Sequence, residues 1–372
     1  MRIPFALVPL VAFGSACGSV SPTVPDGSSA DGAPPDAAAP PDAASAARYV
    51  GADGDHLEDW AIDPGAATFA VTLRARPGAS SATRTFTGSI TTYASGFQRM
   101  TITSSTDAAV PGDGSAYFLA IAGAGGAYLV APPTALGGTG HPLAIAGDCG
   151  AQLGTFGFLV LAPTSLEFAP ATEAAYGVLT VSGPATAVAI TGSQRSLDCA
   201  AGGTCTVDEV LMPPPPGTCT DGATSIVADD VAILRGGAGS LVASIGPGKQ
   251  LLGFTEDASL TFDEIAAKNY LGLAVTANGT QPAVVDFGTD GVALGRLVLD
   301  PISGQTDNGE AISFAFAVDV TRGRVHGTVA NGGNVLTPFV GIARRQGAHV
   351  LLDLLTTSSS DPSPVYVLLV SR

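Results

Sequence analysis

Short apolar segments separated by turn-forming residues recur along the chain from Tyr49 to the C-terminus. Val, Ile, Thr and aromatic residues make up the segments, and Gly, Pro, Asn and Asp interrupt them. Clear alternation of apolar and polar positions runs through residues 68–73, 85–90 and 100–103. Because successive side chains of a strand point to opposite faces, this pattern predicts β-strands and an all-β fold.

Predominantly apolar runs, such as residues 158–162, 350–355 and 365–370, have the length of strands rather than of membrane helices. The sequence suggests one short helix, where Thr261 and Glu264 have the spacing of a capping box and Asn269 can end the turn.

Two pairs of segments resemble each other. Residues 60–71 and 297–316 each contain an apolar stretch, an Asp-Pro turn and a second apolar stretch. Residues 118–145 and 339–367 each contain an apolar stretch, a Gly-Ala turn and an apolar stretch that begins with proline. Any two β-meanders share some of this pattern, but the order and spacing favour a duplication.

These two pairs of similar segments, which we call echoes, predict two related antiparallel β-barrel or β-sandwich domains, over residues 48–220 and 221–372. The proline run at residues 213–216 lies near the expected join. A β-propeller is the alternative architecture, although no motif recurs at the period of a propeller blade.

The N-terminus has the layout of a secretory signal peptide. Arg2 is followed by a short apolar stretch and then by Gly14, Ser15, Ala16 and Cys17. The ending Gly14-Ser15-Ala16-Cys17 resembles the lipobox of bacterial lipoproteins, although members usually carry Leu where this chain has Gly14. The resemblance implies that Cys17 is lipidated and becomes the mature N-terminus. Ordinary cleavage after Ala16 is the alternative.

Cysteine parity supports lipidation of Cys17. The chain has five cysteines, an odd number for a protein exported to an oxidising compartment. If Cys17 is acylated, four disulfide candidates remain: Cys149, Cys199, Cys205 and Cys219. Their spacing favours disulfides over a zinc site, and the sequence leaves all three connectivities open.

Residues 18–47 consist almost wholly of Gly, Ala, Ser, Pro and Asp and contain no aromatic residue. Such a segment cannot bury enough apolar surface to offset its chain entropy, so a disordered, extended tether is expected. Together with the lipobox-like ending, it predicts a protein anchored to a membrane, with the outer membrane as the expected location.

Charged residues are sparse, at 13%, and the net charge is −16. A chain this acidic repels phosphate backbones, so nucleic acid is not expected as a partner. Asp53, Asp55, Glu58 and Asp59 crowd one segment and are candidate ligands for Ca²⁺, but their spacing departs from that of an EF-hand. No other cofactor is indicated.

Motifs of common hydrolases do not occur in the sequence: there is no Gly-x-Ser-x-Gly and no His-Glu-x-x-His. The sequence therefore predicts an exported, lipid-anchored envelope protein with a non-enzymatic binding or structural role. A β-barrel that binds a small apolar ligand is one alternative. A secreted hydrolase without a recognisable motif is the other.

Overall fold

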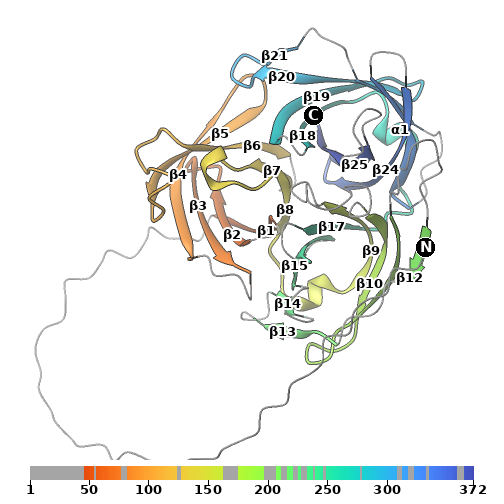
Figure 1. Cartoon of the computed structure of the whole chain (residues 1–372), viewed down its shortest axis with the longest axis horizontal. Helices are drawn as coiled ribbons and strands as arrows, with labels where there is room; N and C mark the ends of the chain where they lie inside the picture. Colours follow the sequence, from red (N-terminus) through yellow and green to blue (C-terminus); the bar gives the residue numbers. More distant parts are fainter. Residues whose placement is uncertain are drawn as a thin grey trace, which may run out of the picture. The chain divides into compact units, whose positions relative to one another are not determined.

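The computed structural model describes residues 46–53, 56–76, 82–123, 127–161, 175–196, 207–210, 216–220, 225–227, 233–237, 239–245, 249–276, 279–307, 312–316, 322–331, 335–357 and 364–372. The expected signal segment, Cys17 and the tether lie outside these residues, as do Asp55, Cys199 and Cys205. Most described residues belong to antiparallel strands (Figure 1). No helix in this part of the chain has the length and apolar character needed to cross a bilayer.

The first sheet is a closed barrel whose strands follow one another in sequence order. Strand β1 closes the barrel by pairing with β8, so that Tyr49 lies opposite Ile145. We call this sheet the first barrel. Its strands are β1 (Ala47–Ala52), β2 (His56–Asp63), β3 (Thr68–Ala75), β4 (Arg84–Thr92), β5 (Phe97–Ser105), β6 (Tyr117–Gly123), β7 (Ala127–Ala131) and β8 (His141–Ile145).

The second sheet has nine strands in the order β12-β11-β10-β9-β17-β16-β15-β14-β13. A bridge between Val188 and Gly217, with N–H···O distances of 2.8 and 2.7 Å, brings β13 beside the start of β11. The sheet therefore curls back on itself. Its strands are β9 (Gly154–Leu161), β10 (Ala175–Ser182), β11 (Ala189–Ser196), β12 (Val207–Val210), β13 (Thr218–Thr220), β14 (Ser225–Val227), β15 (Ile233–Gly237), β16 (Ser240–Ser244) and β17 (Gln250–Thr255).

The third sheet also has nine strands, in the order β19-β18-β26-β25-β24-β23-β22-β20-β21, and pairing of β19 with β20 closes it into a barrel. We call it the third barrel. Its strands are β18 (Asn269–Thr276), β19 (Gly279–Phe287), β20 (Val292–Asp300), β21 (Gln305–Thr306), β22 (Ile312–Phe316), β23 (Arg324–Asn331), β24 (Val335–Gln346), β25 (His349–Thr357) and β26 (Pro364–Ser371).

The prediction of an all-β fold built from antiparallel barrels is confirmed. The boundary expected between residues 220 and 221 differs from the structure, because β13 and β14 pair across it within the second sheet. The described residues form three curled sheets, where the duplication predicted two units. The similar segments lie in the first and third barrels, and none of them lies in the second sheet.

One of the two echoes corresponds to equivalent places in the two barrels. Residues 118–145 form β6, β7 and β8, and residues 339–367 fall in β24, β25 and β26, which are the last three strands of each barrel. The other echo is displaced by one strand, since residues 60–71 belong to β2 and β3 but residues 297–316 belong to β20, β21 and β22.

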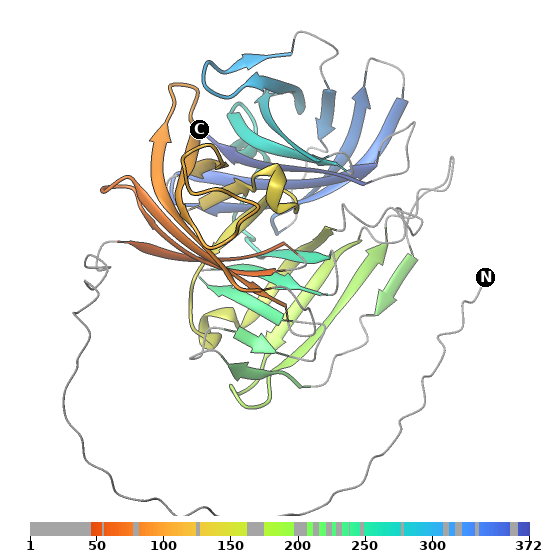
Figure 2. The same cartoon turned by 60° about the vertical axis from the view of Figure 1, so that its left-hand side comes forward.

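Several strands are buried on both faces, which explains why apolar residues follow one another directly in their sequences. In β25, Leu352 and Leu354 point into the third barrel, whereas Leu351 and Leu355 belong to a second apolar cluster outside it. That cluster, the shared core, also contains Leu129 of the first barrel and other residues of all three sheets. Figures 1 and 2 show the sheets side by side, in orange, green and blue.

Backbone and polar contacts fix the junctions between the sheets. A Cβ atom added to Gly237 would lie 2.9 Å from the Gly147 Cα, so the two backbones approach as closely as glycine allows. The Tyr366 hydroxyl donates to the Val160 carbonyl at 3.0 Å, linking the third barrel to the second sheet. Tyr366 and Val160 are buried, and both contacts lie within residues 44–372, which form one compact unit.

The predicted capping box begins the helix α1 (Phe262–Ile265), where the Thr261 N–H donates to Glu264 Oε2 at 2.9 Å. The helix is shorter than the sequence suggested. It ends at Ala266, whose backbone is extended, and Ala267 follows with a positive φ of 55°. Tyr270 donates to the Ile265 carbonyl at 2.8 Å and holds the helix against one end of the third barrel.

Candidate functional site

Aromatic side chains fill the middle of the first barrel. Trp60 packs edge-on against Phe118 with ring centroids 5.0 Å apart, and Phe69 and Phe86 each lie 6.0 Å from Phe118. All four are buried. An eight-stranded barrel is just wide enough for side chains to fill it, and here they do.

A buried polar network occupies the interior of the first barrel next to the β1–β2 turn. Glu58 Oε2 accepts a hydrogen bond of 2.6 Å from Trp60 Nε1 and lies 3.0 Å from His141 Nε2. The other ring nitrogen of His141 lies 2.8 Å from the Thr139 carbonyl oxygen. Gly51 makes room for the carboxylate, because a Cβ atom there would lie 2.7 Å from Glu58 Oε2.

The network holds a charged pair. Burial disfavours a protonated His141, but the Glu58 carboxylate outweighs burial and raises the pKa of His141 to about 9. Glu58 and His141 are 3% and 1% exposed, so neither side chain reaches solvent. Removal of one partner from such a pair leaves an uncompensated buried charge, so the pair stabilises the link between β2 and β8.

A second histidine–carboxylate pair lies at the β1–β2 turn itself. The His56 N–H donates to Asp53 Oδ1 at 2.7 Å, and His56 Nδ1 lies 3.1 Å from Asp53 Oδ2. Hydrogen bonding to Asp53 raises the pKa of His56. Burial acts to raise the pKa of Asp53, and its contacts with His56 more than offset this and lower it. The pair closes the turn and flanks the Glu58 network.

The structure does not bring the candidate Ca²⁺ ligands to one point. Glu58 faces the barrel interior, whereas Asp59, the next residue, faces outwards and pairs with Arg74 at 3.0 Å. Asp53 is engaged with His56, and Asp55 lies outside the described residues. Within the described part of the chain, no group of three or more His, Cys, Asp or Glu side chains has the arrangement of a metal site.

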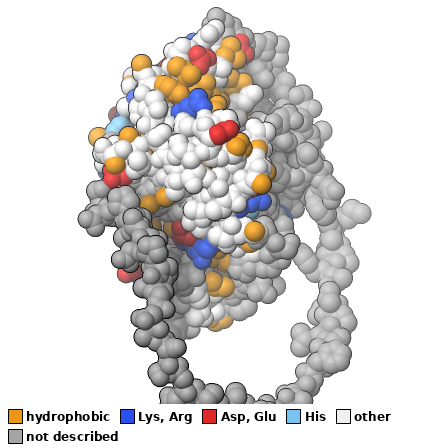
Figure 3. All heavy atoms as spheres, turned by 90° about the vertical axis from the view of Figure 1, so that its left-hand side faces the viewer, with side chains coloured by type: hydrophobic (Ala, Val, Ile, Leu, Met, Phe, Trp, Pro, Cys, Tyr) orange, Lys and Arg blue, Asp and Glu red, His pale blue; other side chains and the backbone are white. Residues whose placement is uncertain are grey.

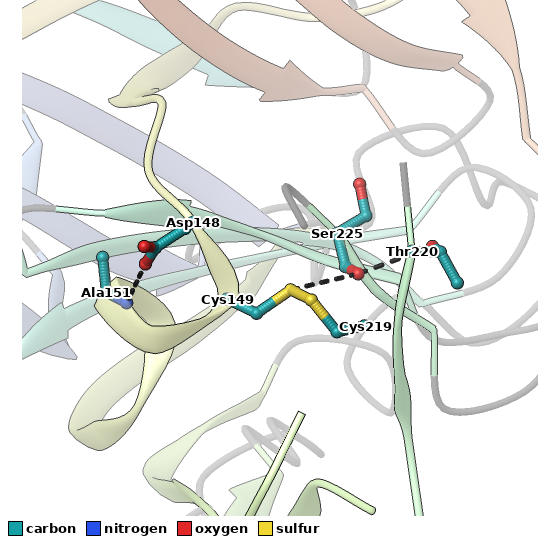
Figure 4. Close-up of a disulfide and its surroundings, with 6 residues drawn as sticks. All are labelled: Asp148, Cys149, Ala151, Cys219, Thr220 and Ser225. Carbon is teal, nitrogen blue, oxygen red and sulfur yellow. Dashed lines mark hydrogen bonds between the residues drawn. A yellow bond between two sulfur atoms is a disulfide. The ribbon is translucent and has the colours of Figure 1, made fainter. Parts of the chain in front are cut away.

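A disulfide joins Cys149 to Cys219 and selects one pairing among those that the sequence left open (Figure 4). Cys149 begins the 3-10 helix η2 (Cys149–Gln152), which Asp148 caps by accepting from the Ala151 N–H at 2.9 Å. Cys219 belongs to β13. The bond closes a loop with a sequence separation of 70 and fixes η2 against the second sheet, within the apolar cluster of that sheet.

Aromatic residues in the third barrel gather toward the end that α1 covers. Phe287, Phe316 and Phe339 form a chain of ring contacts, with centroid distances of 4.3 and 4.7 Å to Phe316. Phe262 of α1 extends the chain, 6.1 Å from Phe287. This end of the barrel is therefore closed.

The opposite end of the third barrel, next to the β18–β19 turn, contains a cavity of about 300 Å³. Small residues leave the space: Ala274, Ala283 and Gly295 all line it. Phe314, which is 2% exposed, lines it from β22. Arg296 and Asp307 are the charged residues of the lining. The remaining lining residues are apolar: Val285, Leu297, Ile312 and Val367.

The cavity was missed at the sequence level because it depends on which small residues face inwards together. Ala274, Ala283 and Gly295 come from three strands, and only the strand register places them at one end of the barrel. The signal available in the sequence was the combination of small residues in otherwise bulky apolar strands.

The face of the first barrel seen from the left of Figure 1 is mainly uncharged. Figure 3 shows it largely white, with hydrophobic side chains dispersed and charged side chains few. The remaining histidines lie apart: His326 is exposed, and His349 Nδ1 contacts the Ser371 carbonyl oxygen at 2.6 Å.

No protein-family model matches this chain, and no curated protein sequence is significantly similar to it. Among solved structures, transferrin binding protein B from Neisseria meningitidis is similar with a TM-score of 0.28 at 9% identity, covering 85% of this chain and 65% of that one. The same protein from Haemophilus parasuis gives 0.26 at 8% identity, with equal coverage. A protein of unknown function from the DUF3598 family of Nostoc punctiforme gives 0.23 at 11% identity, over 60% of this chain and 97% of that chain. These scores are low, and no function follows from them.

Proposed function

We propose that this protein is an exported, lipid-anchored envelope protein that binds a small apolar molecule in the cavity of its third barrel. The observation that carries the proposal is the cavity of about 300 Å³ at the open end of that barrel. Sites for small molecules have volumes of ~300–1,000 Å³. The ring that the β19–β20 pair closes leaves out β21 and has eight strands, a size that can hold one small ligand.

The chemistry of the cavity wall defines the ligand class. Phe314, Val285 and Val367 offer apolar surface, so burial of an apolar group is the source of affinity. Arg296 and Asp307 are the charged groups at the cavity and can orient a polar end of the ligand. We therefore propose a molecule the size of a short acyl chain or a single ring, with one polar end.

The proposal is non-enzymatic because the titratable pairs of the first barrel serve its own structure. Glu58 and His141 are buried and engaged with Trp60 and the Thr139 carbonyl, away from the cavity lining. A general acid or base must lie within hydrogen-bond reach of its substrate. The hydrolase alternative therefore has less support than binding.

Membrane attachment rests on the sequence. The lipobox-like ending at Cys17, the odd number of cysteines and the tether of residues 18–47 all favour an anchored protein, with the outer membrane as the proposed location. The Cys149–Cys219 disulfide supports an oxidising compartment.

Native mass spectrometry of protein purified from its own host tests the cavity. We expect an added mass of a small molecule on the wild-type chain and its loss in Ala283→Leu, which fills the cavity. Ala315→Val is the matched control, because Ala315 is exposed on the outer face of neighbouring β22. The fluorescent probe N-phenyl-1-naphthylamine provides a second measurement. Equal probe binding by both variants would remove the cavity as the site.

Mass analysis of the mature N-terminus tests the anchor. A diacylated Cys17 is expected, and palmitate labelling should vanish in Cys17→Ala. A free Cys17 thiol after export would contradict the anchor while leaving the cavity proposal intact.

A further inference from the structure

A groove of about 530 Å³ lies on the outer face of the first barrel, beside β15 of the second sheet. Its charged lining consists of Arg48 from β1, Asp59 from β2, Arg74 from β3 and Arg235 from β15. We call it the arginine groove. It lies outside the barrels, and it is independent of the cavity in the third barrel.

Arg235 is a built part of the arginine groove rather than a chance surface residue. It is 1% exposed, its Nη1 donates to the Glu58 carbonyl at 2.8 Å, and its Nη2 donates to Asp59 Oδ1. Its Nε is buried and has no hydrogen-bond partner among the described residues. The two hydrogen bonds from Nη1 and Nη2 hold the Arg235 guanidinium in one orientation in the wall of the groove.

Positive charge exceeds negative charge in this lining. Asp59 is shared between two guanidinium groups, since Arg74 Nε lies 3.0 Å from Asp59 Oδ2 while Arg235 contacts Oδ1. Arg48 is exposed and adds a third cation. The described lining therefore concentrates cations on a chain whose net charge is −16, and a concave site focuses such a field.

We propose that the arginine groove binds the phosphate monoester group of a small polar molecule. A phosphate monoester carries close to two negative charges at neutral pH, which matches three guanidinium groups facing one carboxylate. Guanidinium groups bind phosphate oxygens through paired hydrogen bonds.

The rest of the lining suits a compact polar substituent. Ala61, Ala70 and Ala146 leave space beyond that needed for the anion, and Thr72 offers a hydroxyl group. A sugar phosphate has this chemistry, and so does the phosphate headgroup of a lipid. The two sources share the recognised group and differ in whether it lies in solution or in a membrane.

Isothermal titration calorimetry of the full chain with glucose 6-phosphate tests the site, with glucose as the uncharged comparison. We expect binding of the phosphate compound only, and weaker binding as salt is raised. Arg48→Gln and Arg74→Gln should each weaken binding about tenfold, the loss of one charge-assisted hydrogen bond. Circular dichroism verifies that both variants stay folded.

Asp59→Asn gives a change of opposite sign. It keeps an oxygen acceptor for Arg235 but removes the negative charge, so binding should become several-fold tighter. A purely structural role for Asp59 would not produce tighter binding. Arg99→Gln is the matched control, because Arg99 lies on the outer face of the same barrel over Tyr117 and should leave affinity unchanged.

Vesicles that contain phosphatidic acid, compared with phosphatidylcholine vesicles, separate the two sources. Binding of these vesicles alone, lost in Arg48→Gln and Arg74→Gln, would assign the groove to a lipid headgroup. The proposal is overturned if neither probe binds, if glucose binds as well as its phosphate, or if Arg99→Gln weakens binding as much as the groove variants. Because Ala283→Leu leaves the groove intact, failure here is distinguishable from failure of the cavity proposal.

Discussion

The first and third barrels share the sequence pattern of their last three strands but differ at the mouth beside their first hairpin turn. In the first barrel, Glu58 and His141 fill the interior next to the β1–β2 turn. In the third barrel, the corresponding region next to the β18–β19 turn contains Ala274 and Ala283 and is hollow. One scaffold therefore supports a sealed barrel and an open one.

The position of aromatic residues along the barrel accounts for the rest of the difference. Trp60 and Phe118 occupy the middle of the first barrel, directly beneath the Glu58 network. In the third barrel, Phe316 and its partners contact Phe262 of α1 through Phe287, at the closed end. The content of aromatic residues is similar, and their distribution decides whether a cavity remains.

Loss of the polar network should have the largest effect on stability. Glu58→Ala removes the acceptor for Trp60 and leaves His141 as an unpaired buried cation, so we expect a loss of about 3–5 kcal/mol. Trp60, the single tryptophan, lies in the first barrel, so its fluorescence during urea unfolding reports on that barrel. Glu58→Gln keeps a hydrogen-bond acceptor and should cost less. Equal unfolding midpoints for wild type and Glu58→Ala would contradict the role of the network.

The next largest effect is on the pH dependence of the stability of the first barrel, which contains His141. The pKa of His141 is raised in the folded state to about 9, so its contribution is fully present below ~6.5 and is lost as pH rises through about 9. We expect up to about 3 kcal/mol to disappear over this window. Glu58→Gln should flatten the profile, measured by Trp60 fluorescence. A wild-type profile that is already flat between these pH values would refute the charged pair.

The same alanine-to-leucine substitution at one inward position of each barrel tests whether the first barrel is filled and the third is hollow. Ala120→Leu overpacks the first barrel, where Ala120 is 0% exposed, and should cost about 1–3 kcal/mol. Ala283→Leu fills the cavity of the third barrel and should change stability by less than ~1 kcal/mol. Thermal unfolding followed by circular dichroism measures both. Similar losses in the two variants would show that the third barrel has no usable space.

A second pH-dependent effect concerns Asp353, which lies in β25. Its carboxyl group is buried, and burial holds its pKa well above the ordinary value although the backbone N–H of Leu369 acts to lower it. A raised carboxyl pKa makes stability fall as pH rises above ~4. Asp353→Asn should therefore match the wild type near pH 4 and become the more stable protein toward neutral pH. A constant difference between the two at all pH values would exclude ionisation of Asp353 as the cause.

Local patterns sufficed to predict much of the fold. Alternation located strands such as β3, and the capping-box residues Thr261 and Glu264 marked the beginning of α1. The number of sheets could not be predicted from these local patterns, because they indicate where strands lie and not which strands pair. The join near residue 220 illustrates this, since β13 and β14 are consecutive strands of one sheet.

The candidate sites depend on contacts between distant positions, and they were correspondingly harder to predict. Glu58 and His141 are 83 residues apart, and Asp59 and Arg235 are 176 residues apart. The acidic cluster near Asp53 suggested a cation site, but alternation along β2 sends Glu58 inwards and Asp59 outwards. Neighbours in sequence therefore became parts of two separate sites.

The shared core also has a consequence for how the chain is made. The first barrel is complete once Ile145 has been synthesised, but its outward Leu129 packs in the shared core against residues of the third barrel, which follow only after Asn269. At ~5–20 residues per second, this apolar surface stays uncovered for tens of seconds on the growing chain. The protein should therefore depend on a holding chaperone during synthesis, and truncation after the second sheet should yield aggregates rather than a smaller soluble protein.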